Sequence, residues 1–311
     1  MFLNIDKREI GLSLVRLIIG LIILKNIIFL FPYADIFFSK AAILPWQEFV
    51  DFLSQMNLGF LSPIFETTTG VTIFMGTLAA SAFCFCLGIG GTINGLLLYG
   101  LFLVFTQRNG LILDGSDNVT SVILIFLVLS NSYKYFSQSN LYPKFEKTLR
   151  AKPWVNKVTQ LFALCLMVQV TYVYFFTGLA KAQGELWHNG TAVYYTMRVN
   201  EFMATDWNIW LTSNLYFVVI ATYSTLILEL AFPFLVWFRK TKIFILMAMA
   251  SVHIGIYIFM RIDNFSWVMI ATYFAFITDE EYKAMYQKVI NLGIVKRFIP
   301  SLSNKQPKLA A

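Results

Sequence analysis

Long stretches without any charged residue constrain this chain more than any other feature of its sequence. One runs from residue 67 to residue 107, and another covers residues 158–180. About 20 apolar residues suffice for a helix to cross a bilayer, so the first run is long enough for two crossings and the second for one. Hydrophobic residues make up 58% of the chain and charged residues 13%, against about 45–50% and about 25% in a soluble domain. The composition therefore predicts an integral membrane protein.

The positions of the apolar runs predict an all-α fold, a polytopic membrane helix bundle. We expect one transmembrane domain over residues 1–277, with about eight transmembrane helices and further helices at the membrane interface. Gly88, Gly90 and Gly91 predict the turn that divides the first uncharged run, because glycine adopts turn conformations easily. The spans are expected at residues 10–31, on both sides of that turn, and at 118–132, 158–180, 209–238, 243–260 and 265–277.

Two amphipathic segments predict helices outside the spans. Between Trp46 and Met56, apolar residues recur at helical spacing, which predicts either a helix in the interface or one packed on the bundle. Thr278 and Glu281 form the pattern of a capping box that opens a last helix. We therefore expect residues 278–311 to form a cytoplasmic amphipathic helix followed by a disordered tail.

The basic residues predict how the chain is oriented. With the N-terminus in the cytoplasm and eight spans, seventeen Lys and Arg residues fall on inner segments and five on outer segments. Such an excess favours both termini inside. The net charge of +7 arises from basic residues that cluster beside the spans. We expect these residues to contact anionic membrane lipids, and we expect no nucleic-acid partner.

The sequence indicates no metal site. Its three cysteines, Cys84, Cys86 and Cys165, lie inside apolar runs, and the chain has two histidines but no cluster of Cys and His. Cys84 and Cys86 are two residues apart and face different directions on a helix. Neither a disulfide nor a metal pair is therefore expected between them.

Lys181 ends the uncharged run that begins at Val158, and two interpretations are open. In the first, its side chain lies along lipid while the ammonium group reaches water. In the second, the lysine occupies a half-dry pocket, where loss of water favours the neutral amine and makes it usable as a base. Trp187 and Tyr194 follow in an aromatic segment that fits an interfacial belt or the wall of a quinone-sized pocket.

Polar residues within the spans need partners, because a lone charge in lipid is costly. Glu229 is expected to be buried, either held by Arg16 or another polar residue of the bundle as a structural contact, or placed for proton relay or cofactor contact. His253 is either a hydrogen-bonded packing residue or part of a pocket. Asp114 and Asp117 look like paired acids but more simply describe a turn and a helix N-cap before the fourth span.

The Lys181 segment resembles the signature of a known membrane protein family. Gly178-Leu-Ala-Lys181, followed by Trp187 and Gly190-Thr-Ala192, is similar to the motif of the horizontally transferred transmembrane (HTTM) domain family. That family includes the membrane domain of vitamin K-dependent gamma-carboxylase and bacterial proteins of the sporulation-delaying-protein B type, which help mature secreted toxin peptides. The resemblance extends to about Phe276 through Arg16 with Gly20, Asp114-Gly-Ser-Asp117-Asn, Glu229 with Pro233, and His253-Ile-Gly-Ile256.

The resemblance implies a site and a cofactor. Lys181 matches the lysine that is proposed in the carboxylase to deprotonate vitamin K hydroquinone. It would be the catalytic base, and the pocket that opens outward beside it would be formed by Trp187, Glu229, His253 and Tyr194. The cofactor would be a reduced quinone similar to vitamin K, and no metal is implied. The resemblance also implies a multi-pass protein of a bacterial inner membrane, with a peptide substrate or a partner subunit.

The sequence leaves open whether the chain is an enzyme. About 34 residues follow the last predicted span, whereas the carboxylase carries a bulky lumenal domain there, so we do not expect carboxylation directed by a propeptide. One alternative is a smaller quinone-linked membrane enzyme that acts in modification or maturation of a peptide. The other is non-enzymatic: a subunit for maturation or export of, or immunity to, a secreted peptide, similar to the sporulation-delaying-protein B type.

Overall fold

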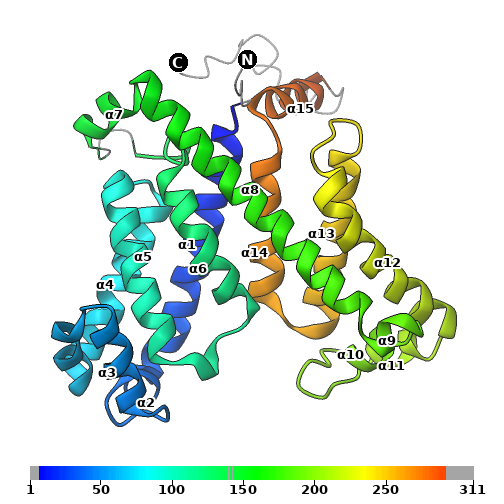
Figure 1. Cartoon of the computed structure of the whole chain (residues 1–311), viewed down its shortest axis with the longest axis horizontal. Coiled ribbons are helices and arrows are strands. Elements are labelled where there is room, and N and C mark those ends of the chain that lie inside the picture. Colours follow the sequence, from blue (N-terminus) through cyan, green and yellow to red (C-terminus); the bar gives the residue numbers. More distant parts are fainter. Residues whose placement is uncertain (1–6, 139–140, 142, 292–311) are drawn as a thin grey trace.

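The structure is a computed structural model that describes residues 7–138, 141 and 143–291. Over these residues the chain folds into helices without any strand, which confirms the all-α prediction (Figure 1). The helices in chain order are α1 (Glu9–Leu30), η1 (Phe31–Tyr33), α2 (Ala34–Phe38), α3 (Trp46–Gln55), η2 (Gly59–Glu66), α4 (Thr68–Cys86), α5 (Gly91–Arg108), η3 (Gly110–Ile112), α6 (Gly115–Leu129), α7 (Lys144–Arg150), α8 (Pro153–Ala182), α9 (Glu185–His188), α10 (Ala192–Thr196), α11 (Trp207–Thr212), α12 (Leu215–Leu235), α13 (Lys242–Met260), α14 (Asp263–Tyr273), η4 (Phe274–Phe276) and α15 (Asp279–Asn291).

All eight predicted spans contain a helix, but they differ in length and apolar character. The span predicted at 209–238 is divided, because α11 ends at Thr212 and α12 covers Leu215–Leu235. Five helical segments of the described chain are long and apolar enough to cross a membrane: Glu9–Phe38, α4, α8, α12 and α13. Helix α6 is apolar but shorter, and α5 and α14 fall outside the set of five. The multi-pass membrane fold is therefore supported, and the count of eight spans stays a prediction.

The long helices run alternately between two opposite faces of the molecule (Figure 1). The start of α1, α7, α15 and the α4–α5 turn share one face, where the Gln138 N–H donates to the Leu87 carbonyl at 2.9 Å and the Asp279 N–H donates to the Lys7 carbonyl at 2.8 Å. Helices α2, α3 and α9 to α11 lie toward the other face, where Arg108 Nε donates to the Phe38 carbonyl at 2.9 Å. This alternation brings the ends of α8 and α13 to the face opposite the start of α1.

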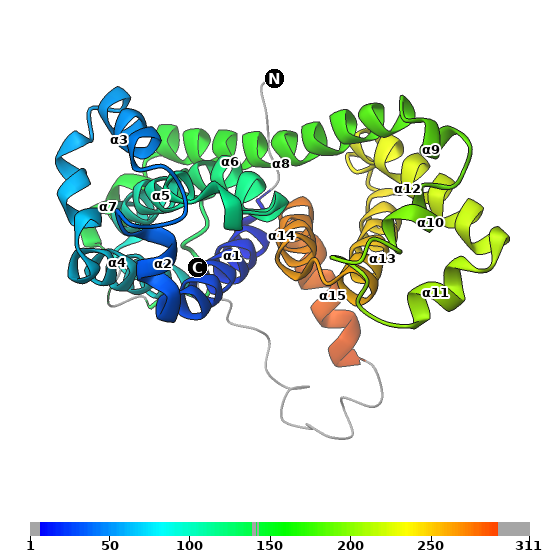
Figure 2. The same cartoon turned by 90° about the horizontal axis from the view of Figure 1, so that it is seen from below.

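Two groups of helices, α1 to α6 and α9 to α13, are joined by α8 and α14 (Figure 2). Helix α8 packs on α6 near its start and on α12 near its end, while α14 contacts α1, α6 and α13. Between membrane helices, van der Waals packing of small residues against neighbours replaces the hydrophobic driving force. At Gly20 of α1 a Cβ atom would come within 2.6 Å of Cys86 Sγ, so glycine allows α1 and α4 to approach closely.

The turn predicted at the glycines after α4 is confirmed. Gly88 and Gly90 have φ angles of +68° and +75°, a region that side-chain-bearing residues rarely adopt. A Cβ atom at Gly88 would also lie 2.2 Å from Ser137 Oγ. Glycine is therefore required here both by backbone conformation and by the close approach of the segment that follows α6.

Both predicted helices outside the spans are present. Helix α3 buries Phe49 and Leu53 and sets the Phe49 ring against Phe65 at 4.9 Å, so it is packed on the bundle, one of the two alternatives. Helix α15 opens with the predicted capping box, in which the Thr278 N–H donates to Glu281 Oε2 at 2.9 Å and the Glu281 N–H donates to Thr278 Oγ1 at 3.2 Å. The tail predicted to be disordered lies outside the described residues.

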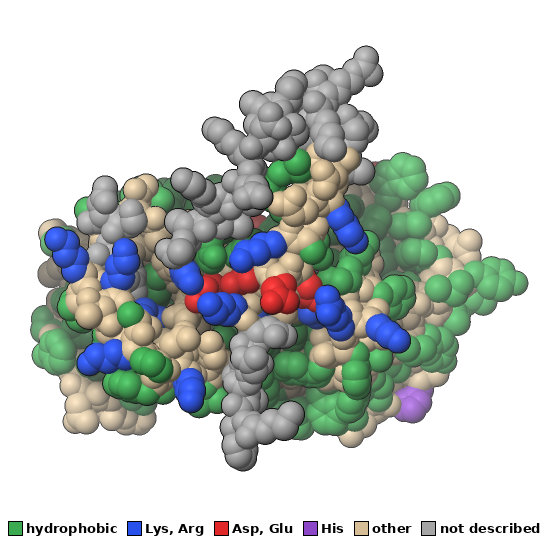
Figure 3. All heavy atoms as spheres, turned by 90° about the horizontal axis from the view of Figure 1, so that it is seen from above, with side chains coloured by type: hydrophobic (Ala, Val, Ile, Leu, Met, Phe, Trp, Pro, Cys, Tyr) green, Lys and Arg blue, Asp and Glu red, His purple; other side chains and the backbone are tan. Residues whose placement is uncertain are grey.

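The face that carries the start of α1 and α15 is rich in Lys and Arg side chains, with a few acidic side chains among them (Figure 3). Two ion pairs there join segments distant in sequence: Lys134 Nζ lies 2.9 Å from Glu9 Oε2, and Lys242 Nζ lies 2.6 Å from Glu281 Oε2. The second pair attaches α15 to the start of α13.

Candidate functional site

Lys181 and Glu229 form an ion pair near the end of α8. The Lys181 ammonium group donates to Glu229 Oε1 on the neighbouring helix α12. The Glu229 side chain is 9% exposed and the Lys181 side chain 29% exposed. The predicted burial of Glu229 is confirmed. Of the two expected partners, Arg16 or another polar residue of the bundle, the first is wrong and the second is confirmed, because Lys181 of the family-like motif pairs with Glu229.

Close packing of α8 on α12 brings the two charges together. A Cβ atom at Gly178 would lie 2.9 Å from Leu230 Cδ2, so the first glycine of the motif lets the helices approach one turn before Lys181. Thr177, four residues before Lys181, places its Oγ1 at 3.5 Å from Glu229 Oε2. Pro233 has no N–H group to donate to the Glu229 carbonyl one turn earlier, which weakens α12 at this level.

A second set of polar side chains lies deeper in the bundle. Tyr174, His253 and Tyr273 are 3%, 3% and 5% exposed. The Tyr174 hydroxyl lies 2.8 Å from His253 Nε2 and also hydrogen-bonds the Tyr273 hydroxyl. Over the described residues His253 Nδ1 is buried without a hydrogen-bond partner. Three helices, α8, α13 and α14, thus supply one connected group of hydroxyl and imidazole groups.

The deep set and the ion pair are joined through α8. Tyr174 precedes Lys181 on this helix by seven residues, about two turns, so both lie on one helix face, and Thr177 between them places its Oγ1 at 3.5 Å from Glu229 Oε2. We call these five residues the polar cluster: Tyr174, Lys181, Glu229, His253 and Tyr273. It extends from a partly exposed lysine to a fully enclosed imidazole, and every member has a hydrogen-bonding group that can accept or release a proton.

The two aromatic residues predicted beside Lys181 take different places. The Trp187 ring lies against the ammonium group, with its centroid 5.3 Å from Lys181 Nζ, which is within cation–π range. Tyr194 instead faces Arg198, whose guanidinium carbon lies 4.3 Å from the ring centroid. Trp187 therefore contacts the polar cluster. Tyr194, on α10, is separate from the cluster and contacts Arg198.

Arg16 lies among backbone carbonyls near the α4–α5 turn, on the side of the bundle away from Lys181. It is fully buried, and its Nε donates to the Ser132 carbonyl at 2.8 Å. Its other donor contacts are the carbonyls of Phe85, Cys86, Tyr135 and Phe136 and the hydroxyl of Ser137. Arg16 therefore joins α1 to the end of α4 and to the segment after α6, without any acidic partner among the described residues.

Asp114 and Asp117 form the predicted N-cap. Asp114 Oδ1 accepts from the Ser116 N–H at 2.6 Å, and Asp117 Oδ2 accepts from the Asp114 N–H at 3.0 Å. This is a reciprocal capping box at the start of α6. The N-cap prediction is confirmed, and both carboxylates are explained by helix structure.

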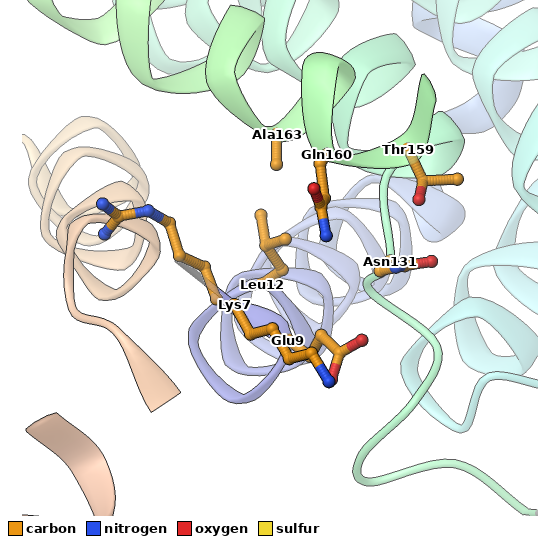
Figure 4. Close-up of a pocket in the computed structure, with 8 residues that line it drawn as sticks. Lys7, Glu9, Leu12, Asn131, Thr159, Gln160 and Ala163 are labelled. Carbon is orange, nitrogen blue, oxygen red and sulfur yellow. The ribbon is translucent and has the colours of Figure 1, made fainter. Parts of the chain in front are cut away.

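A cavity near the start of α1 is too small to serve as a substrate site. It lies between α1, α8 and the segment after α6, next to Glu9, Leu12, Asn131 and Gln160 (Figure 4). Its volume is about 10 Å³, which is room for at most one water molecule. The polar cluster, with its partly exposed lysine, is the stronger candidate.

Sequence reasoning did not single out Tyr174, Thr177 or Tyr273. A signal for the first two was available, because residues 174, 177 and 181 are spaced to share one face of a helix. Reading that face back from Lys181 would have linked Tyr174 to the lysine. Tyr273 carries no such signal, since its contact with Tyr174 depends on how α14 packs.

These observations define a multi-pass membrane helix bundle with a polar cluster that starts at a lysine on one face. Comparison with protein families agrees with this class: the profile of the HTTM domain matches residues 8–280. The chain therefore belongs to the HTTM domain family. Comparisons with curated proteins and with solved structures give no match.

Proposed function

We propose that the polar cluster is the proton-accepting site of a membrane enzyme that acts on a reduced quinone, with Lys181 as the base. The observation that carries the proposal is the ion pair between Lys181 and Glu229. It sets a titratable acid directly against the lysine, at the only partly exposed end of an otherwise enclosed cluster of described residues.

The ion pair gives Lys181 a way to become a base. As an ammonium ion it cannot accept a proton, but transfer of one proton to Glu229 leaves a neutral amine beside a neutral carboxylic acid. The amine can then take a proton from an O–H group, and the carboxylic acid holds the first proton beside the Thr177 hydroxyl.

The residues around Lys181 fit a flat aromatic alcohol. Trp187 offers a half-buried ring beside the ammonium group for stacking. The Lys181 side chain is partly exposed, so its amine can be reached by the O–H group of a ring stacked there. When bound, a reduced quinone would supply the acidic O–H group and the electrons for an oxidation. The protein's own residues would hold its ring, remove a proton and exclude lipid.

We further propose that the basic face is cytoplasmic and that Lys181 therefore opens outward, in the inner membrane of a bacterium. Basic side chains gather on the face with the start of α1 and α15 (Figure 3), as the positive-inside rule requires of a cytoplasmic surface. Lys181 lies at the opposite end of α8 from that face. An outward site suits modification or maturation of a peptide that leaves the cell.

The test uses purified full-length protein and vitamin K hydroquinone with dioxygen, and it follows loss of the hydroquinone by ultraviolet absorbance. The wild type should accelerate the loss, and Lys181→Arg should reduce the enzymatic rate by about 10²–10⁴-fold, the usual contribution of a general base. Lys40→Arg, at an exposed surface pair, is the matched control. If the wild type gives no acceleration, the alternative of a non-enzymatic subunit for maturation, export or immunity replaces this proposal.

A further inference from the structure

A groove on the membrane-facing surface, lined by α1, α13 and α14, carries an ion pair at one end. Figure 2 shows α14 between the other two helices. The groove has a volume of about 430 Å³, within the usual range of ligand sites. At its polar end Lys25 Nζ lies 2.7 Å from Asp263 Oδ2 and 2.5 Å from Asn264 Oδ1. The groove is separate from the polar cluster, and nothing in the proposed function uses it.

The two walls of the groove are ordered from polar to apolar. On α1, residues 18, 21, 22 and 25 are spaced to share one helix face, so Ile18, Leu21 and Ile22 continue inward from Lys25. On the other side, Trp267 lies one turn after Asp263, and its ring contacts Tyr257 at 5.6 Å between centroids. A molecule that fits must therefore have a polar head and an apolar chain.

The depth of the ion pair places the polar end at a headgroup level. Glu9 begins α1, at the face where α15 also lies. Lys25 follows Glu9 by sixteen residues, about 24 Å along a helix. Since the apolar core of a bilayer is about 30 Å thick, Lys25 approaches the opposite interface. Asp263 follows the α13–α14 turn, which lies at that same face.

The charges of the groove select the headgroup. The Lys25 and Asp263 side chains are 37% and 48% exposed, so each retains open surface beyond their mutual contact. An ammonium group has a further donor for a phosphate oxygen, and a carboxylate has further acceptor positions for an amine. We propose that this groove binds phosphatidylethanolamine, with its phosphate on Lys25, its amine on Asp263 and one acyl chain along Ile18 to Ile22.

Native mass spectrometry of delipidated full-length protein tests this proposal, with dioleoyl phosphatidylethanolamine and dioleoyl phosphatidylglycerol as probes. The wild type should bind one phosphatidylethanolamine at least about tenfold more tightly than Lys25→Ala does, because charge-assisted contacts are lost in the variant. Lys40→Ala, which removes a lysine from an exposed pair with Glu66, should bind as the wild type does.

A second variant separates lipid binding from the structural role of the ion pair. Leu21 is 49% exposed, so Leu21→Trp adds bulk to the groove and keeps both side chains of the Lys25–Asp263 ion pair. It should fold in wild-type amounts and lose the tightly bound lipid. Equal phosphatidylethanolamine affinity in the wild type, Lys25→Ala and Leu21→Trp would overturn the proposal, and so would tighter binding of phosphatidylglycerol to the wild type.

Discussion

Arg16 and Lys181 are both cations inside membrane helices, yet their partners differ in kind. Arg16 is fully buried, and its donors reach backbone carbonyls and one hydroxyl. Lys181 is partly exposed and faces a carboxylate, beyond which lie hydroxyl and imidazole groups. Carbonyl groups hold a charge without exchanging protons, whereas a carboxylate and an imidazole can exchange them. The comparison separates a cation that fixes the fold from one that we propose for proton chemistry.

The largest effect should come from removing the structural cation. Arg16→Leu leaves several buried carbonyls without donors, at about 1–3 kcal/mol for each one, which exceeds the stability margin of many proteins. We expect almost no folded protein by fluorescence-detected gel filtration of solubilised membranes. Arg239→Leu, at an exposed position, should behave as the wild type. Wild-type yield of monodisperse Arg16→Leu would remove the structural side of the comparison.

The acid of the polar cluster should show a smaller and more selective effect. Breaking a buried ion pair by removing one partner costs about 3–5 kcal/mol, and we expect the lower end here because Lys181 is 29% exposed. Glu229→Ala should therefore lower the unfolding temperature more than Glu229→Gln, which keeps an acceptor for Lys181. Glu66→Ala, from a surface pair, is the control. If Glu229→Ala and Glu229→Gln unfold together with the wild type, the pair is not buried as described.

The deep part of the cluster is tested by Tyr174→Phe. The substitution removes the hydroxyl that joins His253 to Tyr273 and should cost about 1 kcal/mol per hydrogen bond lost. In the hydroquinone assay it should slow turnover while the protein remains folded. Tyr223→Phe, which loses only a contact to the His188 carbonyl, should keep full turnover. Unchanged turnover in Tyr174→Phe would restrict the functional site to Lys181 and Glu229.

The smallest effect concerns an ion pair outside the spans. Burial acts to raise the pKa of Glu281, but its hydrogen bonds from Lys242 and Thr278, with the Lys242 charge, hold this pKa below the usual value of a glutamate. A lowered folded-state pKa means that the pair stabilises the protein above the unfolded-state pKa and that this gain is lost as pH falls through the folded-state pKa. Hydrogen exchange of α15 should therefore rise on acidification in the wild type and respond less in Glu281→Gln. An identical pH response in both would contradict this role.

Much of the fold could be predicted because it depends on local patterns. Uncharged runs gave the positions of the long helices, the glycines after Cys86 gave a turn, and Asp114 with Asp117 gave an N-cap. The number of spans could not be fixed in this way. Helices such as α5 and α14 combine apolar residues with polar ends or short length, so composition alone does not decide whether they cross.

The site was predicted as residues but not as contacts. Glu229 and His253 were chosen because polarity inside a span needs a partner, and Lys181 was chosen because it ends an uncharged run and matches the family motif. Sequence could not say that Glu229 pairs with Lys181 and not with Arg16, since that choice depends on the close approach of α8 and α12 at Gly178. For the same reason Tyr273 could not be found, because only the packing of α14 brings it to Tyr174.

The central claim is that Lys181 serves proton chemistry while Arg16 serves structure, and one paired measurement tests it. Arg16→Lys and Lys181→Arg keep both charges, and each is assayed for folded yield and for hydroquinone turnover per folded molecule. We predict that Arg16→Lys loses folded yield but keeps turnover per molecule, because lysine cannot supply the planar set of donors of arginine. Lys181→Arg should keep its yield and lose turnover, because arginine does not release a proton near neutrality. If the wild type turns over the hydroquinone and Lys181→Arg does so at the same rate, the claim is contradicted.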